Sequence, residues 1–296
     1  MRRSRRATIL VGNRPAEVKA MAAPSHLLAP STTARFRPPR FGLGGSHLGN
    51  PEPADNTADN TADQKADETA VATVDAAYQA GIRFFDTSPA YGDSERRLGT
   101  ALQRRPRGEF LVSTKVVGDD PEGSIRASSE RLGLAVDLVF AQDDAAYPVL
   151  DRLRRDGVIK ALGAVSDDWR ELDRLVRDVE LDCVLLTTHY ELLDQSAKPL
   201  LDRCVARGVS VVVSGVLTPQ VLHVETIQAR RLFAVCERYG VSLPQAALAF
   251  PSRHSAVTSV LIAASSPAEI RADAALVRQP VPERLWKDPE LLRLLS

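Results

Sequence analysis

Three ionisable side chains stand near the ends of two apolar stretches in the first half of the chain. The apolar residues at 82–85 predict a short buried strand, and Asp86 follows them directly. Tyr91 comes shortly afterwards, and Lys115 ends a second apolar run that begins at residue 110. A carboxylate at the end of a buried strand is costly unless it is paired, and Lys115 is its natural partner. A cation beside a phenol favours the ionised phenol. Tyr91 is therefore a candidate general acid for a carbonyl oxygen, with Lys115 and Asp86 tuning its acidity.

This chemistry requires parallel strands whose ends meet on one face. Residues 82–86 and 110–115 predict two such strands, and we expect Ser94 to cap an intervening helix that runs from Glu95 to Gln103. In a barrel of alternating strands and helices, every strand ends on the same face, and the catalytic residues gather there. The 296 residues suffice for one large α/β barrel or for two ordinary domains.

The stretch Gly81–Gly99 resembles the signature of the aldo/keto reductase family, G-I-x-x-F-D-T-x-x-x-Y-G-x-S-E-x-x-L-G. The run Tyr190–Ser196 contains the L-L-D-Q-S wording of the family's aldose and fucose 1-dehydrogenase branch. The resemblance extends in order over residues 40–296. It implies a (β/α)8 TIM barrel, a nicotinamide cofactor and a catalytic tetrad that includes Asp86, Tyr91 and Lys115. The dinucleotide-binding fingerprint G-x-G-x-x-G is absent, and the family does not require it.

The fourth position of the tetrad departs from the family pattern. Gln142 follows the predicted strand 138–141, where the family usually has a histidine that orients the substrate carbonyl. A glutamine amide donates a hydrogen bond but cannot act as an acid. By analogy with removal of an oxyanion donor, the exchange could lower the rate by about tenfold to a thousandfold. We expect Gln142 to orient the carbonyl. His189, near the end of the sixth strand, is either a rim residue or a substitute for the missing histidine.

The resemblance also implies a set of cofactor-binding residues, at the glycine-rich loop 41–49 and after the fifth to eighth strands. They are Gly45, Ser46, Ser166, Asp167, Thr187, Ser214, Gly215, Ser265 and Arg271. Asp167 occupies a position where the family has asparagine. After the eighth strand the usual cation for the 2′-phosphate of NADP is missing, and Glu269 and Asp273 supply negative charge instead. The helix start at Ser266 can still receive a phosphate, but these charges slightly favour NAD over NADP.

Two segments lie outside the repeating pattern of strands and helices. Residues 1–37 are rich in Arg, Pro, Ala and Ser and predict a disordered leader before a barrel at 38–296. Residues 51–69 contain four Ala-Asp tetrapeptides without an apolar face, which predicts a solvated, low-complexity acidic insertion in the first strand-to-helix loop. We expect the first helix to begin near Thr69. The repeat lacks the glycine turn and terminal glutamate of a calcium loop, so no metal site is expected.

Composition limits the partners and the compartment. Lys and Arg number 38, and Asp and Glu also number 38, so no net charge attracts nucleic acid or an anionic membrane. The three cysteines lack C-x-x-C spacing, which indicates a reducing compartment. No apolar run approaches the roughly 20 residues that span a bilayer, and the apolar part after the basic start is too short for an export signal. We expect a cytoplasmic protein.

Two functions of different classes remain open. The first is an NAD(P)-dependent oxidoreductase that moves hydride between nicotinamide and a sugar or a small aldehyde or ketone, with Tyr91 as the general acid and base. The second is a barrel that has lost efficient catalysis and serves as a cofactor-binding or regulatory module. Gln142 and Asp167 favour the second function. The presence of Asp86, Tyr91 and Lys115 favours the enzyme.

Overall fold

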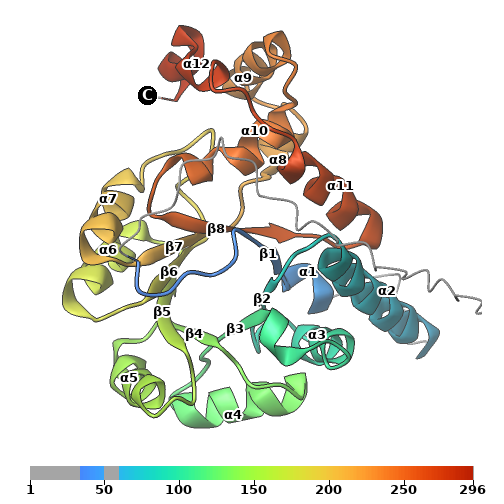
Figure 1. Ribbon diagram of the computed structural model, residues 1–296, viewed down its shortest axis with the longest axis vertical. Coiled ribbons are helices and arrows are strands. Elements are labelled where there is room, and N and C mark those ends of the chain that lie inside the picture. Colours follow the sequence, from blue (N-terminus) through green and yellow to red (C-terminus); the bar gives the residue numbers. More distant parts are fainter. Residues whose placement is uncertain (1–33, 50–59, 296) are drawn as a thin grey trace, which may run out of the picture.

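A closed barrel of eight parallel strands forms the centre of the molecule, and helices surround it (Figure 1). The computed structural model describes residues 34–49 and 60–295. The strands follow one another around the barrel in chain order, and the last pairs with the first. They are β1 (Phe41–Gly44), β2 (Phe84–Asp86), β3 (Leu111–Lys115), β4 (Leu138–Ala141), β5 (Ala161–Ser166), β6 (Cys183–Leu186), β7 (Ser210–Val213) and β8 (Val257–Ala263). The predicted (β/α)8 barrel is confirmed.

The helices lie outside the strands, and α9 and α12 lie together beyond one side of the barrel (Figure 1). They are α1 (Ser46–Gly49), α2 (Asn60–Gln79), α3 (Ser94–Leu102), α4 (Pro121–Leu132), α5 (Tyr147–Arg155), α6 (Trp169–Asp178), α7 (Lys198–Arg207), α8 (Pro219–Leu222), α9 (Ile227–Arg238), α10 (Leu243–Ala249), α11 (Pro267–Arg278) and α12 (Pro289–Leu294). Short 3-10 turns lie at Arg107–Glu109, Asp144–Ala146, Pro251–Arg253 and Leu285–Lys287. Side chains such as Asp168, Thr226 and Ser266 accept a backbone N–H at a helix start and so fix where these helices begin.

Alternating strand residues divide the apolar core into two parts. One set points into the barrel and includes Phe84, Phe140, Leu185 and Leu261, while a larger set fills the space between strands and helices. Glycine makes room for the inner rings, because a Cβ at Gly42 would lie 2.7 Å from Cδ1 of Phe84. The filled interior leaves the C-terminal ends of the strands as the face on which a site can form.

The end of the predicted leader packs against the barrel rather than being disordered. Phe36 contacts the inner core cluster, and its carbonyl oxygen accepts a hydrogen bond from the Ser210 hydroxyl. The backbone N–H of Arg35 donates to the carbonyl oxygen of Gly208, 3.1 Å away. Residues 34–37 therefore belong to the barrel, which corrects the boundary expected at residue 38. The rest of the leader, residues 1–33, lies outside the described residues.

The acidic insertion is shorter than the sequence predicts. Helix α2 begins at Asn60 rather than near Thr69, so residues 60–69 are helical. Alanine favours helix, Asp63 suits the first turn, and the Gln64 amide donates to Glu68 one turn later, at 3.1 Å. Asp67 also pairs with two arginines of α3. Residues 60–69 have no apolar face in the sequence, and these polar contacts stabilise this part of the helix instead. Residues 51–59 lie outside the described residues.

All three cysteines of the chain lie in the part that the structure describes. Cys183, Cys204 and Cys236 are free and buried, as the sequence indicates, and burial raises the pKa of each thiol. Such thiols are poor nucleophiles. Within residues 34–49 and 60–295, none of the helices combines the length and the apolar character needed to cross a membrane.

Candidate active site

Asp86 and Lys115 form an ion pair at the C-terminal ends of β2 and β3. Asp86 pairs in register with Ser113, so Lys115 follows on the same side of the neighbouring strand. Lys115 Nζ lies 2.8 Å from Asp86 Oδ2, and the Ser113 hydroxyl donates to Asp86 Oδ1 at 2.6 Å. Lys115 Nζ also donates to the carbonyl oxygen of Thr87 at 2.9 Å. Both carboxylate oxygens are paired, which a side chain only 4% exposed requires.

Tyr91 lies beside this pair on the loop between β2 and α3. Its ring centroid is 4.8 Å from Lys115 Nζ. The loop is held by two backbone hydrogen bonds of 3.0 Å, from Tyr91 N to the Ser88 carbonyl and from Ser94 N to the Tyr91 carbonyl. The predicted trio of acid, phenol and lysine is thus assembled, with the phenol next to the cation.

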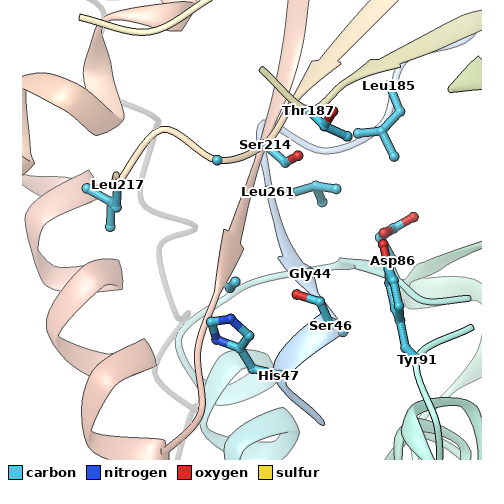
Figure 2. A pocket seen from close by; sticks show the side chains of 13 residues that line it. Gly44, Ser46, His47, Asp86, Tyr91, Leu185, Thr187, Ser214, Leu217 and Leu261 are labelled. Carbon is cyan, nitrogen blue, oxygen red and sulfur yellow. The ribbon is translucent and has the colours of Figure 1, made fainter. Parts of the chain in front are cut away.

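Asp86 and Tyr91 face a cavity of about 320 Å³ at the mouth of the barrel (Figure 2). The loop after β1 supplies one side of the cavity, while the ends of β6, β7 and β8 supply the other. The lining residues are Gly44, Gly45, Ser46, His47, Asp86, Tyr91, Leu185, Thr187, Ser214, Gly215, Leu217, Leu261 and Ala263. Five of the predicted cofactor residues, Gly45, Ser46, Thr187, Ser214 and Gly215, therefore meet around one space.

Two glycines shape this cavity. A Cβ at Gly45 would lie 2.6 Å from Ser94 Oγ and 2.7 Å from the carbonyl oxygen of Asp86. Gly215 has φ of 69°, and a Cβ there would lie 2.7 Å from the carbonyl oxygen of Thr187. Only glycine suits a positive φ at such a close approach. At these two glycines the wall is bare backbone, which allows a flat ring such as a nicotinamide to approach closely.

Ser94 serves the cavity loop rather than a helix cap. The predicted helix is α3, but Ser94 lies inside it, and Asp93 precedes it without a side-chain capping bond. The Ser94 hydroxyl instead donates to the carbonyl oxygen of Gly45 at 2.8 Å and accepts from the Thr87 hydroxyl at 2.9 Å. Ser94 therefore joins the loop after β1 to the end of β2, which sequence spacing alone does not reveal.

Ser166 ends β5 and Asp167 follows it, and neither is among the residues that line the cavity. The Ser166 hydroxyl donates to Glu171 at 2.6 Å and accepts from the Asp168 N–H at 3.1 Å. Asp167 Oδ1 accepts from the Thr187 hydroxyl at 2.5 Å. Because Thr187 donates its proton to Asp167, its oxygen is left as a hydrogen-bond acceptor in the cavity wall.

Ser265 and Arg271 belong to the start of α11, also outside the cavity lining. Ser266 caps the helix by accepting from Glu269 N. The Glu269 carboxylate accepts from the Ser265 N–H at 2.8 Å and from its hydroxyl at 2.9 Å. Burial, followed by the charge of Glu269, raises the pKa of Asp273 to about 6. A carboxylate of the chain itself therefore occupies the helix start, and Arg271 is exposed.

Gln142 is exposed directly after β4 and does not line the cavity. His189 has φ of 69°, and its Nδ1 lies 2.8 Å from Asp194 Oδ2. It also does not line the cavity, so the wall gives no support to its replacing the missing histidine. The histidine in the wall is His47 of α1 (Figure 2).

Sequence reasoning missed His47 and the apolar lining residues Leu185, Leu217, Leu261 and Ala263. Leu261 and Ala263 lie two residues apart on β8 and so share one side of the strand, but the sequence of β8 has no polar alternation that would reveal that side. His47 follows Ser46 in the glycine-rich loop, but nothing in the sequence of this loop shows that the His47 side chain reaches the cavity.

Comparison with known proteins agrees with this geometry. The sequence profile of the aldo/keto reductase family matches residues 40–288. D-threo-aldose 1-dehydrogenase from Pseudomonas sp. is 32% identical over 288 residues, covering 76% of this chain and 88% of that protein. Pyridoxal 4-dehydrogenase from Microbacterium luteolum is 28% identical, covering 73% and 85%. Among solved structures, the holo form of an aldo-keto reductase from Bacillus halodurans has a TM-score of 0.71 at 20% identity, covering 90% of this chain and 95% of that one.

The barrel and its site define an oxidoreductase of the kind that uses a nicotinamide cofactor. The chain belongs to the aldo/keto reductase family, and the resemblance to its aldose 1-dehydrogenase branch is confirmed.

Proposed function

We propose that this protein transfers hydride between NAD(H) and a sugar or a small aldehyde or ketone, with Tyr91 as the general acid and base. The observation that carries the proposal is the buried Asp86–Lys115 ion pair beside Tyr91 at the edge of the cavity. A phenol that gives a proton to a carbonyl oxygen becomes an anion. Lys115 lies close enough to stabilise that anion, and Asp86 fixes the position of the lysine.

The chain's own residues perform the proton transfer. In reduction, Tyr91 donates its proton to the substrate oxygen as the carbonyl carbon becomes tetrahedral. In oxidation, the Tyr91 phenolate takes the hydroxyl proton back. A nicotinamide cofactor, when bound, would supply or accept the hydride at the carbonyl carbon. Gly45, Ser46, Thr187, Ser214 and Gly215 would hold its ring end, because they supply the backbone and short polar groups of the wall.

Gln142 takes the part of an orienting donor in this proposal. It is exposed directly after β4, at the same end of the barrel as the cavity, although it does not line the cavity itself. The amide can donate to the carbonyl oxygen but has no acidic proton to give. Tyr91 is therefore the source of the proton, and the enzyme is expected to be slower than a family member with histidine at this position.

The start of α11 favours NAD. Glu269 places a negative charge where a helix N-terminus would otherwise receive a phosphate. A carboxylate can accept hydrogen bonds from ribose hydroxyls but repels a 2′-phosphate. Arg271, on the same helix, is exposed and offers at most partial compensation.

The relatives guide the choice of substrate. The names of two relatives describe dehydrogenation of D-threo-aldose and of pyridoxal. The cavity combines polar groups with leucine side chains and is large enough for a small carbonyl compound beside a ring. Aldoses and small aldehydes are the substrates to test first. The buried free cysteines fit a reducing compartment, so we assign the enzyme to the cytoplasm.

Calorimetric titration with NADH and NADPH, followed by turnover of aldoses and small aldehydes, tests this function. We expect NADH to bind at least about tenfold more tightly than NADPH, the size of one favourable or repulsive charge contact. Glu269→Gln should narrow that ratio by improving NADPH binding, because it removes the charge but keeps an acceptor.

Two other results would change the conclusion. Equal binding of both cofactors would remove the role assigned to Glu269. Tight binding without turnover of any aldose or aldehyde would favour the alternative, a cofactor-binding or regulatory barrel in which Gln142 has replaced the catalytic histidine.

A further inference from the structure

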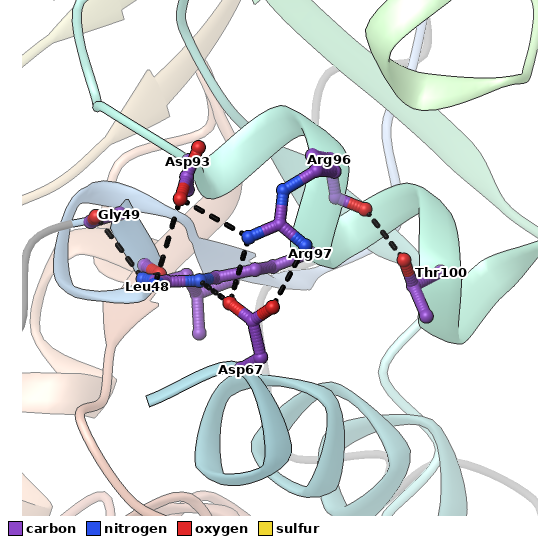
Figure 3. Close-up of polar contacts among 7 residues, drawn as sticks. All are labelled: Leu48, Gly49, Asp67, Asp93, Arg96, Arg97 and Thr100. Atoms are coloured by element: carbon purple, nitrogen blue, oxygen red, sulfur yellow. Dashed lines mark hydrogen bonds and ion pairs between the residues drawn. The ribbon is translucent and has the colours of Figure 1, made fainter. Parts of the chain in front are cut away.

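Two neighbouring arginines of α3 share one carboxylate of α2 but have different surroundings (Figure 3). Arg96 is half-exposed, and its guanidinium contacts Asp67 at 2.7 and 2.8 Å and Asp93 at 3.1 Å. Arg97 is only 4% exposed. Its Nε donates to Asp67 Oδ1 at 2.7 Å, while its Nη1 points the opposite way, into the protein.

The inner nitrogen of Arg97 holds the end of α1. It donates to the carbonyl oxygen of Leu48 at 2.7 Å and to that of Gly49 at 3.1 Å. The last carbonyls of a helix have no partner within the helix, and a buried one must find another donor. A cation there also complements the helix dipole. Arg97 is thus the charged anchor of the short helix that carries Ser46 and His47 into the cavity wall.

The same end of α1 lies against the Tyr91 loop. A Cβ at Gly49 would lie 1.5 Å from the carbonyl oxygen of Tyr91, so the two backbones are in direct contact. Asp93 N donates to the Gly49 carbonyl at 3.4 Å. At the other end of α1, two neutral hydrogen bonds hold Gly45. Gly45 N donates to the Asp86 carbonyl oxygen, and Ser94 Oγ donates to the Gly45 carbonyl oxygen. A shift of Gly49 towards the Tyr91 loop would therefore displace the backbone of Tyr91.

We propose that Arg97 is a positioning residue that holds α1 against the Tyr91 loop, and that Asp67 holds Arg97 in the orientation this needs. Arg97 contacts the chain on both sides of residues 50–59, through Gly49 and Asp67. The fourth Ala-Asp tetrapeptide thereby acquires a role, because its aspartate completes the contact. The planar guanidinium bonds a carboxylate with one edge and two carbonyls with another, which a lysine cannot do at once.

The charge of Asp67 persists under assay conditions. Arg96, as the largest influence, and Arg97 lower the pKa of Asp67 to about 2. The contact is therefore complete at neutral pH. Its effect on turnover rests on the proposed function, whereas its effect on the backbone does not, and the two can be measured separately.

Hydrogen–deuterium exchange of the protein without ligand tests the backbone effect. We expect Arg97→Gln to speed exchange in peptides covering 44–49 and 87–95 by about tenfold or more, since it removes a buried anchor. Arg97→Lys and Asp67→Asn should give smaller increases in the same peptides. Arg96→Gln is the matched control, because Arg96 shares Asp67 but also bonds Asp93 and, within the described part of the chain, makes no hydrogen bond or ion pair with α1, so the peptide covering 44–49 should exchange as in the wild type.

Kinetics test the functional consequence. Arg97→Gln should lower kcat by about tenfold to a hundredfold and weaken NADH binding, because misplacement by about 1 Å costs this much. Arg97→Lys should recover part of the loss, and Arg96→Gln should stay within about threefold of the wild type.

Two results would overturn the proposal. One is unchanged exchange in both peptides for Arg97→Lys and Asp67→Asn. The other is an Arg97 variant that loses only thermal stability, with kcat and KM unchanged well below its melting temperature. A wild-type protein that binds neither NADH nor NADPH would refute the proposed function, and exchange would still decide the role of Arg97.

Discussion

At the scale of single residues, the site depends on a charge that is buried and fully paired. Asp86 accepts from Ser113 and Lys115, and Lys115 approaches the Tyr91 ring. The pairing of Asp86 with Lys115 could be predicted, because an acid and a base at the ends of adjacent apolar strands have few other partners. The part played by Ser113 could not, since it depends on the register between β2 and β3.

Substitutions of Gln142 should change kcat in both directions. We expect Gln142→Ala to lower kcat about tenfold, the cost of one lost neutral donor at a reacting oxygen, with little change in NADH affinity. Gln142→His should raise kcat by at least a similar factor, because it restores an orienting group that can also carry a proton. Steady-state kinetics with one aldehyde check both variants. Equal kcat for wild type, alanine and histidine would show that residue 142 does not meet the substrate.

At the scale of elements, polar contacts decide what apolar patterns leave open. The family resemblance implied the eight-stranded barrel, whereas the apolar pattern placed the start of the first helix near Thr69 instead of Asn60. The residues 60–69 that extend α2 are alanine and polar residues, and Asp67 among them pairs with the distant Arg96 and Arg97. Such contacts join segments far apart in sequence, so no local signal reports them.

Asp273 of α11 makes stability depend on pH, because its burial, and after that the charge of Glu269 one turn earlier, raises its pKa. Because the pKa of Asp273 is raised to about 6 in the folded protein, the folded protein binds a proton at Asp273 more tightly than the unfolded chain does. Asp273 therefore reduces stability as pH rises from about 4 through 6. We expect Asp273→Asn to be more stable than the wild type at pH 8, by about 1–3 kcal/mol, and equally stable near pH 4.

Urea unfolding at several pH values measures this difference. Glu269→Gln should give a smaller gain in stability, because Glu269 also accepts a hydrogen bond from Ser265. An Asp273→Asn gain that is the same at pH 5 and pH 8 would mean that packing, and not charge, is responsible.

At the scale of the whole molecule, the two ends of the barrel have separate tasks. The C-terminal ends of the strands form the cavity, whereas the N-terminal end is closed by residues 34–37. Of the residues predicted at the first end, Asp86, Tyr91 and five of the nine cofactor residues line the cavity, whereas Gln142 does not. The second was predicted as a disordered leader, because a single apolar residue among Arg and Pro gives no periodic pattern.

Phe36 should consequently contribute to stability and not to catalysis. We expect Phe36→Ala to lower the free energy of unfolding by about 1–3 kcal/mol, since the ring is partly buried against the inner core. Arg35→Ala is the matched control, because that side chain is largely exposed and only its backbone N–H bonds Gly208. Thermal unfolding and kcat, measured together, should show a loss of stability at unchanged turnover. A large loss of kcat below the melting temperature would connect this end of the barrel to the site.

The assignment of Tyr91 as the general acid and base is tested most directly by the Tyr91→Phe variant. Single-turnover reduction of an aldehyde by enzyme-bound NADH isolates the chemical step from binding and product release. We predict that the variant binds NADH within about threefold of the wild type and reduces the aldehyde about a hundredfold to ten-thousandfold more slowly. Reduction at the wild-type rate, with NADH bound, would show that the proton comes from another group.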